Sequence, residues 1–133
     1  MMRICFIIAG TLGLLNAQSF TDPIFATPTE ILDFGNVDSK NDPGFRTITF
    51  TNTGGAPLLI TNIIPSCGCT VPEWPKDAIK PGQSSEIKVK YDISRIGLIS
   101  KTITIVTNEP DGKEADGKII YKQYVIPVKG TVK

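Results

Sequence analysis

The chain has 133 residues, with 14 Lys and Arg residues against 13 Asp and Glu residues and no histidine. This balance excludes a strongly basic surface, so we expect no nucleic-acid partner. The absence of imidazole also excludes cysteine-protease chemistry, in which a histidine activates the thiol.

Residues 1–17 have the features of a secretory signal peptide. Arg3 provides a positive charge, residues 4–15 are apolar, and the chain becomes polar after Ala17. The apolar run is shorter than the roughly 20 residues that a transmembrane helix needs. We therefore expect cleavage near Ala17, no stable membrane insertion afterwards, and a periplasmic or secreted location.

After the signal peptide we expect a short N-terminal extension, residues 18–29, and one domain, residues 30–133. Apolar residues alternate with polar ones in several short runs, and no helical period is sustained. Phe50 and Ile105 are expected to face the core. The predicted strands are residues 31–37, 45–52, 58–64, 85–91, 98–107 and 119–132.

Turn-forming residues separate these strands. Asn52 can bond to backbone groups ahead of it, while the glycines and the proline after it favour a tight corner. The residues of this structural motif are Asn52, Gly54, Gly55 and Pro57, and a second turn is predicted at Pro81 and Gly82. Residues 108–117 hold four carboxylates and two Asp-Gly pairs, which predicts a solvated hairpin tip.

Short strands in this number, within about a hundred residues, predict an all-β fold. We expect a single immunoglobulin-like, seven-stranded antiparallel β-sandwich, with a β-barrel as the alternative. The spacing of cysteine, tryptophan and cysteine in antibody domains is absent, because Cys67 and Cys69 lie too close together to bridge two sheets and Trp74 follows them.

Cys67 and Cys69 are separated by Gly68, and the third cysteine, Cys5, belongs to the predicted signal peptide. Four interpretations of the pair remain open. The thiols can be small buried groups, or form a local disulfide with a redox role that Gly68 makes feasible. They can also bind a metal, of which copper(I) accepts two thiolates, or bond to another protein.

Trp74 lies between two prolines in the segment after the cysteines. A tryptophan in a loop can be an interface anchor or can cover one end of a sandwich. If the protein works by contact, we expect a partner-binding loop over residues 66–74, with Ser66, Thr70 and Trp74 as its contact residues.

Four motifs, in this order along the chain, resemble those of a known family. They are Ile-Leu-Asp-Phe-Gly-Asn-Val at residues 31–37, Phe-Thr-Asn-Thr-Gly-Gly-Ala-Pro-Leu at 50–58, Ser-Cys-Gly-Cys-Thr at 66–70 and Ile-Lys-Pro-Gly at 79–82. The family is a bacterial secreted one of unknown function. It is similar to the Hydin-type immunoglobulin-like domains and, more distantly, to major sperm protein.

This resemblance extends over nearly the whole predicted domain. It implies a seven-stranded sandwich without enzymatic activity, and Hydin-type domains generally act as docking modules on larger assemblies. We therefore expect a protein-interaction or structural module that has a protein partner, no catalytic residue and no cofactor. The alternative is a periplasmic thiol-redox or copper(I)-binding module that uses Cys67 and Cys69.

Overall fold

A computed structural model describes residues 22–133, which form eight strands and no helix. The predicted signal peptide lies outside the described residues. The strands are β1 (Phe25–Ala26), β2 (Leu32–Val37), β3 (Phe45–Asn52), β4 (Ile60–Pro65), β5 (Thr70–Glu73), β6 (Ser84–Tyr91), β7 (Gly97–Lys113) and β8 (Ile119–Val132). The all-β prediction is confirmed, but the strand count in this part of the chain is eight instead of seven.

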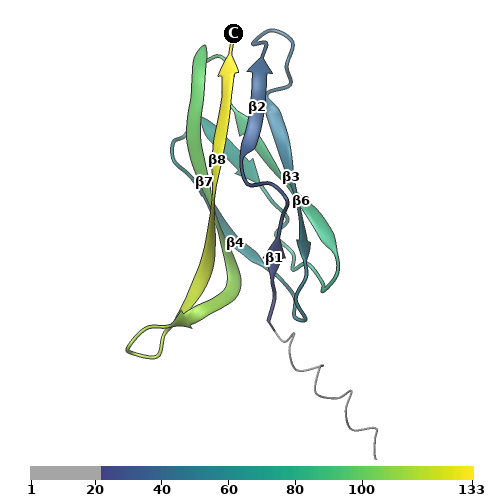
Figure 1. Ribbon diagram of the computed structural model, residues 1–133, viewed down its shortest axis with the longest axis vertical. Coiled ribbons are helices and arrows are strands. Elements are labelled where there is room, and N and C mark those ends of the chain that lie inside the picture. Colours follow the sequence, from purple (N-terminus) through teal and green to yellow (C-terminus); the bar gives the residue numbers. More distant parts are fainter. Residues whose placement is uncertain (1–21) are drawn as a thin grey trace, which may run out of the picture.

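The strands form two sheets of four. One has the order β1-β3-β6-β5 and the other the order β2-β8-β7-β4, and their ribbons form two layers along the long axis of the molecule (Figure 1). The core lies between the sheets, and Phe50 and Ile105 in it have no exposed surface, as predicted. Along β6, Ile87, Val89 and Tyr91 are buried and alternate with exposed residues, because side chains in a strand point to opposite faces in turn.

Two short strands account for the difference in strand count. β1 has two residues and lies within the predicted N-terminal extension, whereas β5 has four residues and lies within the predicted loop after the cysteines. β5 contains Pro72, which offers no backbone N–H, and it lies at the edge of its sheet, where proline is tolerated. Runs this short show no alternation that a sequence pattern can detect.

The expectation of a fully antiparallel sandwich was wrong at one pair of strands. β2 pairs with β8 in parallel, from Leu32 opposite Val128 to Val37 opposite Val132, and all other strand pairs are antiparallel. After β1 the chain passes from one sheet to the other and only then enters β2. Because β2 and β8 are distant in sequence, no tight turn requires them to run in opposite directions.

The hairpin of β7 and β8 is longer than predicted. β7 continues to Lys113, past the predicted end at residue 107, and the turn is closed by the N–H of Gly117 donating to the carbonyl of Glu114 at 2.9 Å. The pairing register shifts between Val106 and Pro110 and again before Lys113. These irregularities let the strand pass Pro110 without a regular ladder bond at that residue.

Within residues 22–133 there is no helix with the length and apolar character needed to cross a bilayer.

Candidate functional site

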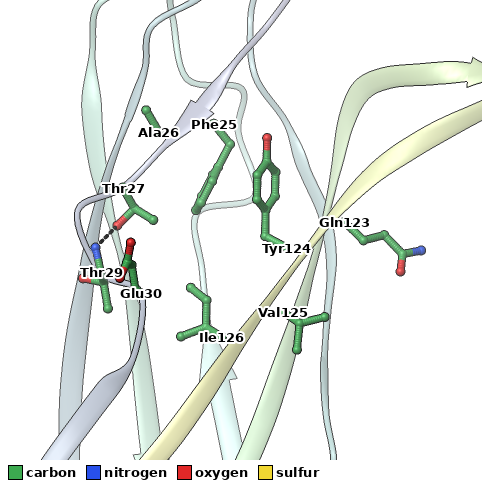
Figure 2. A pocket seen from close by; sticks show the side chains of 9 residues that line it. All are labelled: Phe25, Ala26, Thr27, Thr29, Glu30, Gln123, Tyr124, Val125 and Ile126. Atoms are coloured by element: carbon green, nitrogen blue, oxygen red, sulfur yellow. Dashed lines mark hydrogen bonds between the residues drawn. The ribbon is translucent and has the colours of Figure 1, made fainter.

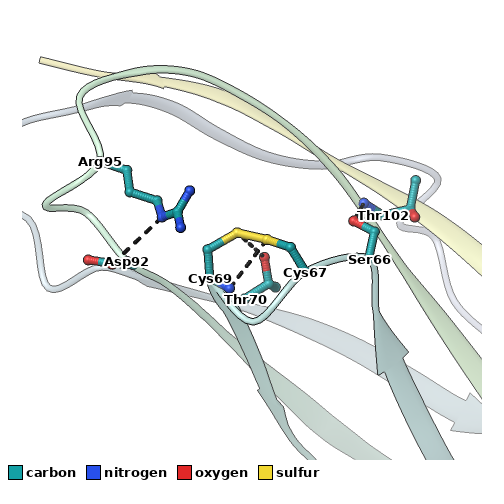
Figure 3. Close-up of a disulfide and its surroundings, with 7 residues drawn as sticks. All are labelled: Ser66, Cys67, Cys69, Thr70, Asp92, Arg95 and Thr102. Carbon is teal, nitrogen blue, oxygen red and sulfur yellow. Dashed lines mark hydrogen bonds and ion pairs between the residues drawn. A yellow bond between two sulfur atoms is a disulfide. The ribbon is translucent and has the colours of Figure 1, made fainter.

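The segment after β4 holds Cys67 and Cys69, whose sulfurs form a disulfide (Figure 3). The two Cα atoms are 5.4 Å apart, which is within the usual range for a disulfide. Gly68 between them has no positive φ, and a Cβ there would meet no atom within 4 Å. The structure therefore shows the local pairing, and the interpretation as two free thiols does not hold for this form.

Each sulfur accepts one hydrogen bond. The N–H of Cys69 donates to Sγ of Cys67 at 3.3 Å, and Oγ1 of Thr70 lies 3.9 Å from Sγ of Cys69. A disulfide sulfur has no proton, so the Thr70 hydroxyl is the donor in the second contact. Cys69 is only 6% exposed and belongs to the core, whereas Cys67 is half-buried against it.

No cluster of three or more Cys, His, Asp or Glu side chains within the described part of the chain is arranged to hold a metal ion. Copper(I) binding by the two cysteines would need their thiolates. In the disulfide neither sulfur is available in that form.

Charged side chains lie beside the disulfide. The N–H of Asp92 donates to the carbonyl of Cys69 at 2.9 Å, which places the start of the β6–β7 connection next to the cysteines. Nε of Arg95 is 3.8 Å from Oδ2 of Asp92, and the guanidinium points toward the disulfide (Figure 3). Hydrogen bonds from Ser94 hold the pKa of Asp92 below its usual value. Asp92 is therefore an anion at neutral pH and forms an exposed ion pair with Arg95.

The predicted partner-binding residues do not share one surface. Oγ of Ser66 accepts a hydrogen bond from the N–H of Thr102 at 3.1 Å, and Thr70 is 1% exposed. Trp74 follows β5, so the whole strand separates it from the cysteines. The segment of residues 66–74 is thus not one loop, because β5 occupies its middle.

Trp74 packs on the core and is half-buried. Its Nε1–H donates to the carbonyl of Ile60, the first residue of β4, at 3.2 Å. Nζ of Lys76 lies 3.2 Å from the centroid of the indole ring, a cation–π contact. These contacts match the interpretation of Trp74 as a cover over the sandwich, and its polar atom already has an internal partner.

Asn52, at the end of β3, is completely buried and uses both ends of its side-chain amide. Oδ1 accepts from the N–H groups of Ile24 at 3.2 Å and Gly54 at 3.0 Å. Nδ2 donates to the carbonyls of Ala56 at 2.7 Å and Ile79 at 2.9 Å. One side chain thus joins the segment before β1, the turn after β3 and the segment before β6.

Gly54 and Gly82 both lie close to Asn52, and each position favours glycine for a different reason. A Cβ on Gly54 would lie 2.1 Å from the carbonyl oxygen of Asp22, so any larger residue would push the N-terminal segment away. Gly82, after Pro81, has a φ of 82° and its N–H donates to the carbonyl of Asn52 at 2.7 Å. Gly55 donates its N–H to the carbonyl of Asp22, and Pro57 accepts from Nδ2 of Asn108.

Glu109 is a feature that the sequence interpretation missed, because it assigned this residue to a solvated hairpin tip. It is 6% exposed, since β7 continues past it. Oε1 accepts from the hydroxyl of Tyr124 at 2.7 Å and from the N–H of Phe25 at 3.2 Å, while Oε2 is 3.6 Å from Nζ of Lys122. Burial, followed by the bond to Glu109, raises the pKa of Tyr124 above its ordinary range.

The outer edge of β8 has no strand partner over most of its length. β2 pairs only with residues 128–132 of β8, and no other described strand lies on that side. Both backbone groups of Thr102 bond to Ser66, away from β8, so Thr102 and Pro127 form a pair without ladder bonds. Because such pairs alternate along an antiparallel ladder, the N–H and C=O groups of Gln123 and Val125 point to the open side. We call residues 119–127 the free edge of β8.

Next to this edge lies a pocket of about 540 Å³. It is bounded on one side by β1 and the residues that follow it, including Thr29 and Glu30, and on the other by β8 (Figure 2). The rings of Phe25 and Tyr124 lie with centroids 4.9 Å apart, and Ile126 points to the same side of β8. The pocket therefore has an aromatic and apolar wall beside unpaired backbone groups. The large apolar side chains exposed along the edge are Ile119, Ile120, Tyr121 and Val125.

Residues 25–116 match the model of the family described as "Protein of unknown function (DUF1573)". The chain belongs to this family. The matched residues include β1 to β7 and end before β8, so the strand with the free edge lies outside the match. No curated protein matches the sequence.

Several solved structures share the fold at low sequence identity. A protein of unknown function from Porphyromonas gingivalis W83 has a TM-score of 0.61 at 16% identity, over 98% of this chain and 53% of that one. The Vibrio cholerae VesB protease has a TM-score of 0.56 at 13% identity, over 84% of this chain and 32% of that one. The CsuC–CsuE chaperone–tip adhesion subunit complex of Acinetobacter baumannii gives 0.50 at 14% identity, over 84% and 57%.

This DUF1573 chain thus spans between 32% and 57% of the length of these solved chains. At such identities the likeness is one of fold.

Proposed function

We propose that this chain is a non-catalytic, immunoglobulin-like interaction module that binds an extended segment of a partner protein along the free edge of β8. The observation behind the proposal is the row of unpaired backbone groups at Gln123 and Val125, next to an apolar pocket. An extended peptide can add a strand to such an edge, with affinity from main-chain hydrogen bonds and selectivity from pockets for alternate side chains. This role needs no cofactor.

The free edge is a better candidate than residues 66–74. Ser66, Thr70 and Trp74 all direct their polar atoms to partners inside the domain, as described above. The edge of β8, in contrast, has exposed apolar side chains, among them Val125 with 62% of its surface exposed. Its nine residues offer about 30 Å of strand, enough for a peptide of similar length.

The pocket favours a separate polypeptide over a second copy of this chain. If two copies paired through β8, the pocket of each copy would have to be filled by the inward-facing side chains of the other copy's β8, which are Tyr124 and Ile126. Ile126 is 4% exposed and Tyr124 stacks on Phe25, so both already cover their own core. A partner strand with unengaged apolar side chains can fill the pocket, and exposed Glu30 at its rim favours a basic residue there.

Two relationships support a docking role. The resemblance to Hydin-type domains implies a docking module, and one of the structures with this fold is a complex between a chaperone and an adhesion subunit.

We also propose that the module acts in the periplasm or outside the cell, because of the predicted signal peptide. The exported protein should then begin near Gln18 in N-terminal sequencing of the soluble extracytoplasmic fraction. An intact residue 1 in the membrane fraction contradicts this location.

Nuclear magnetic resonance can test the binding mode, with a nine-residue peptide of alternating valine and threonine as the probe. We expect its addition to shift the amide signals of Gln123 and Val125 and to slow their hydrogen exchange, because their N–H groups acquire acceptors. Val125→Pro removes one edge N–H and should weaken peptide binding by about 3- to 10-fold. Val125→Thr keeps that N–H and is the matched control.

Circular dichroism of the three proteins verifies that they are equally folded. Equal affinity of Val125→Pro and wild type, or shifts confined to other strands, contradicts binding at this edge.

A further inference from the structure

The disulfide between Cys67 and Cys69 contributes little to holding the fold together. It closes a loop within a single connection and joins no two strands or sheets. The stabilisation that a disulfide gives by restricting the unfolded chain is smallest for such short loops. The bond can therefore open while both sheets stay intact, which distinguishes it from a structural cross-link.

Its two sulfurs differ in access and in surroundings. Cys67 is half-buried at the surface, whereas Cys69 is 6% exposed. A thiolate that approaches from solvent therefore meets the sulfur of Cys67, and the sulfur of Cys69 is the leaving group. Oγ1 of Thr70, a hydrogen-bond donor, lies 3.9 Å from Sγ of Cys69. The positively charged guanidinium of Arg95 points toward the disulfide (Figure 3), and both groups would stabilise a departing thiolate.

A backbone hydrogen bond would also stabilise the thiolate of Cys67 in the reduced state. Sγ of Cys67 accepts the N–H of Cys69 at 3.3 Å, a bond that becomes stronger when the acceptor is a thiolate. A pocket of about 300 Å³ lies beside the disulfide on the side of Cys69, which lines it together with Gly68, Lys90 and Asp92, whereas Cys67 does not line it. It offers room for the residues that flank an attacking cysteine. Stabilisation of the reduced form makes a disulfide more oxidising.

We infer that Cys67 and Cys69 form a thiol–disulfide exchange site that oxidises a protein dithiol. A thiolate of the partner attacks Sγ of Cys67, so that a mixed disulfide forms, the bond between Cys67 and Cys69 breaks, and its electron pair leaves on Sγ of Cys69. The partner's second thiolate then attacks its own bonded sulfur and releases Cys67. The partner leaves as a disulfide, two electrons have moved to this chain, and its two thiolates are free to take up protons from water.

Glutathione is the probe for the first test. The oxidised wild-type protein is incubated in buffers with increasing ratios of reduced to oxidised glutathione, and free thiols are alkylated and counted by mass spectrometry. We expect two thiols to appear at ratios that leave buried structural disulfides intact, with an unchanged circular dichroism spectrum. A bond that resists reduction, or a fold that is lost with it, overturns the proposal.

Two single variants test which sulfur is attacked. Cys69→Ser keeps the more accessible thiol and should form a mixed disulfide with oxidised glutathione about 10-fold or more faster than Cys67→Ser, which keeps the buried one. Equal rates in two folded variants overturn the assignment of Cys67 as the attacked sulfur.

The effect of Arg95 on the ease of reduction is tested with a separate variant. Arg95→Gln should lower the ratio of reduced to oxidised protein at a fixed glutathione ratio by about 2- to 5-fold, the scale of an exposed charge interaction. Lys80→Gln removes a positive charge at an exposed turn far from the cysteines and is the matched control. The same small change in both variants, with equal melting temperatures, shows that Arg95 does not act on the thiolate.

Discussion

At Asn52 and Glu109, single side chains connect segments that are far apart in sequence. Each of these buried polar groups has several hydrogen-bond partners, as buried polar groups require. Asn52 bonds to four backbone groups, and Glu109 bonds to Phe25 and Tyr124. Both of them fasten the segment around β1, which has only two residues of strand pairing.

We expect Asn52→Ala to lower the free energy of unfolding by about 2 to 4 kcal/mol, because it leaves several buried backbone groups without partners. Urea unfolding followed by circular dichroism measures this. Thr53→Ala, at the exposed neighbouring position, should change the free energy by no more than about 0.5 kcal/mol. Equal losses in the two variants would show that the amide hydrogen bonds do not matter.

Tyr124 predicts a dependence of stability on alkaline pH. Its pKa in the folded protein is raised above the ordinary value of 10.0, mainly by burial. The contribution is fully present below the unfolded-state pKa and is lost progressively as the pH rises from that value through the folded-state pKa, because the unfolded tyrosine ionises first. The unfolding free energy of wild type, relative to Tyr124→Phe, should therefore be constant up to about pH 9 and fall above about pH 10. A difference that stays constant to pH 11 falsifies the prediction.

Of the two buried polar residues Asn52 and Glu109, the sequence indicated a structural role only for Asn52. Asn52 stands before two glycines and a proline, a combination that predicts a corner. Glu109 stands among other carboxylates and before Pro110, which is typical of a solvated turn. Its burial depends on the register shift that carries β7 past Pro110, and no local pattern reveals such a shift.

At the scale of elements, alternation determined which strands could be predicted. β3 and β8 have the predicted bounds, and β6 differs from its prediction by one residue. β1 and β5 are too short to alternate, and their places depend on the edges of strands that lie elsewhere in the sequence. The free edge of β8 was beyond prediction for the same reason, because it depends on where β2 begins, at Leu32 opposite Val128.

The core strands should tolerate truncation poorly. Phe50→Ala and Ile105→Ala should each lower the free energy of unfolding by about 2 to 5 kcal/mol, because both side chains are fully buried and leave a cavity. Glu86→Ala, on the exposed face of β6, is the control and should change it by about 0.5 kcal/mol or less. Urea midpoints that coincide for all three variants would contradict the assignment of the inner faces.

At the scale of the whole molecule, the two proposed sites lie far apart. The disulfide adjoins the connection after β6, near the start of β3, whereas the pocket lies beside β1, which pairs with the end of β3. The eight residues of β3 span about 25 Å. Sites at such a separation, without shared partners, usually act independently.

Reduction of the disulfide should therefore leave binding of the alternating peptide unchanged within about 2-fold. Isothermal titration calorimetry of the oxidised protein and of Cys67→Ser, Cys69→Ser measures this. A larger change in affinity would mean that the exchange site regulates the docking edge. Loss of either activity alone would leave the other proposal intact.

The parallel pairing of β2 with β8 also governs the order of assembly during synthesis. β2 leaves the ribosome early, but its one sheet partner among residues 22–133 consists of residues 128–132, almost a hundred residues further along. Until then β2 has an unpaired edge, and the cost of closing so long a loop has to be met before the contact forms. A nascent chain at residue 116 can complete the sheet that contains β3, β5 and β6, while the other sheet waits for β8. Chaperones that shield exposed strands would therefore have a long interval in which to engage this protein.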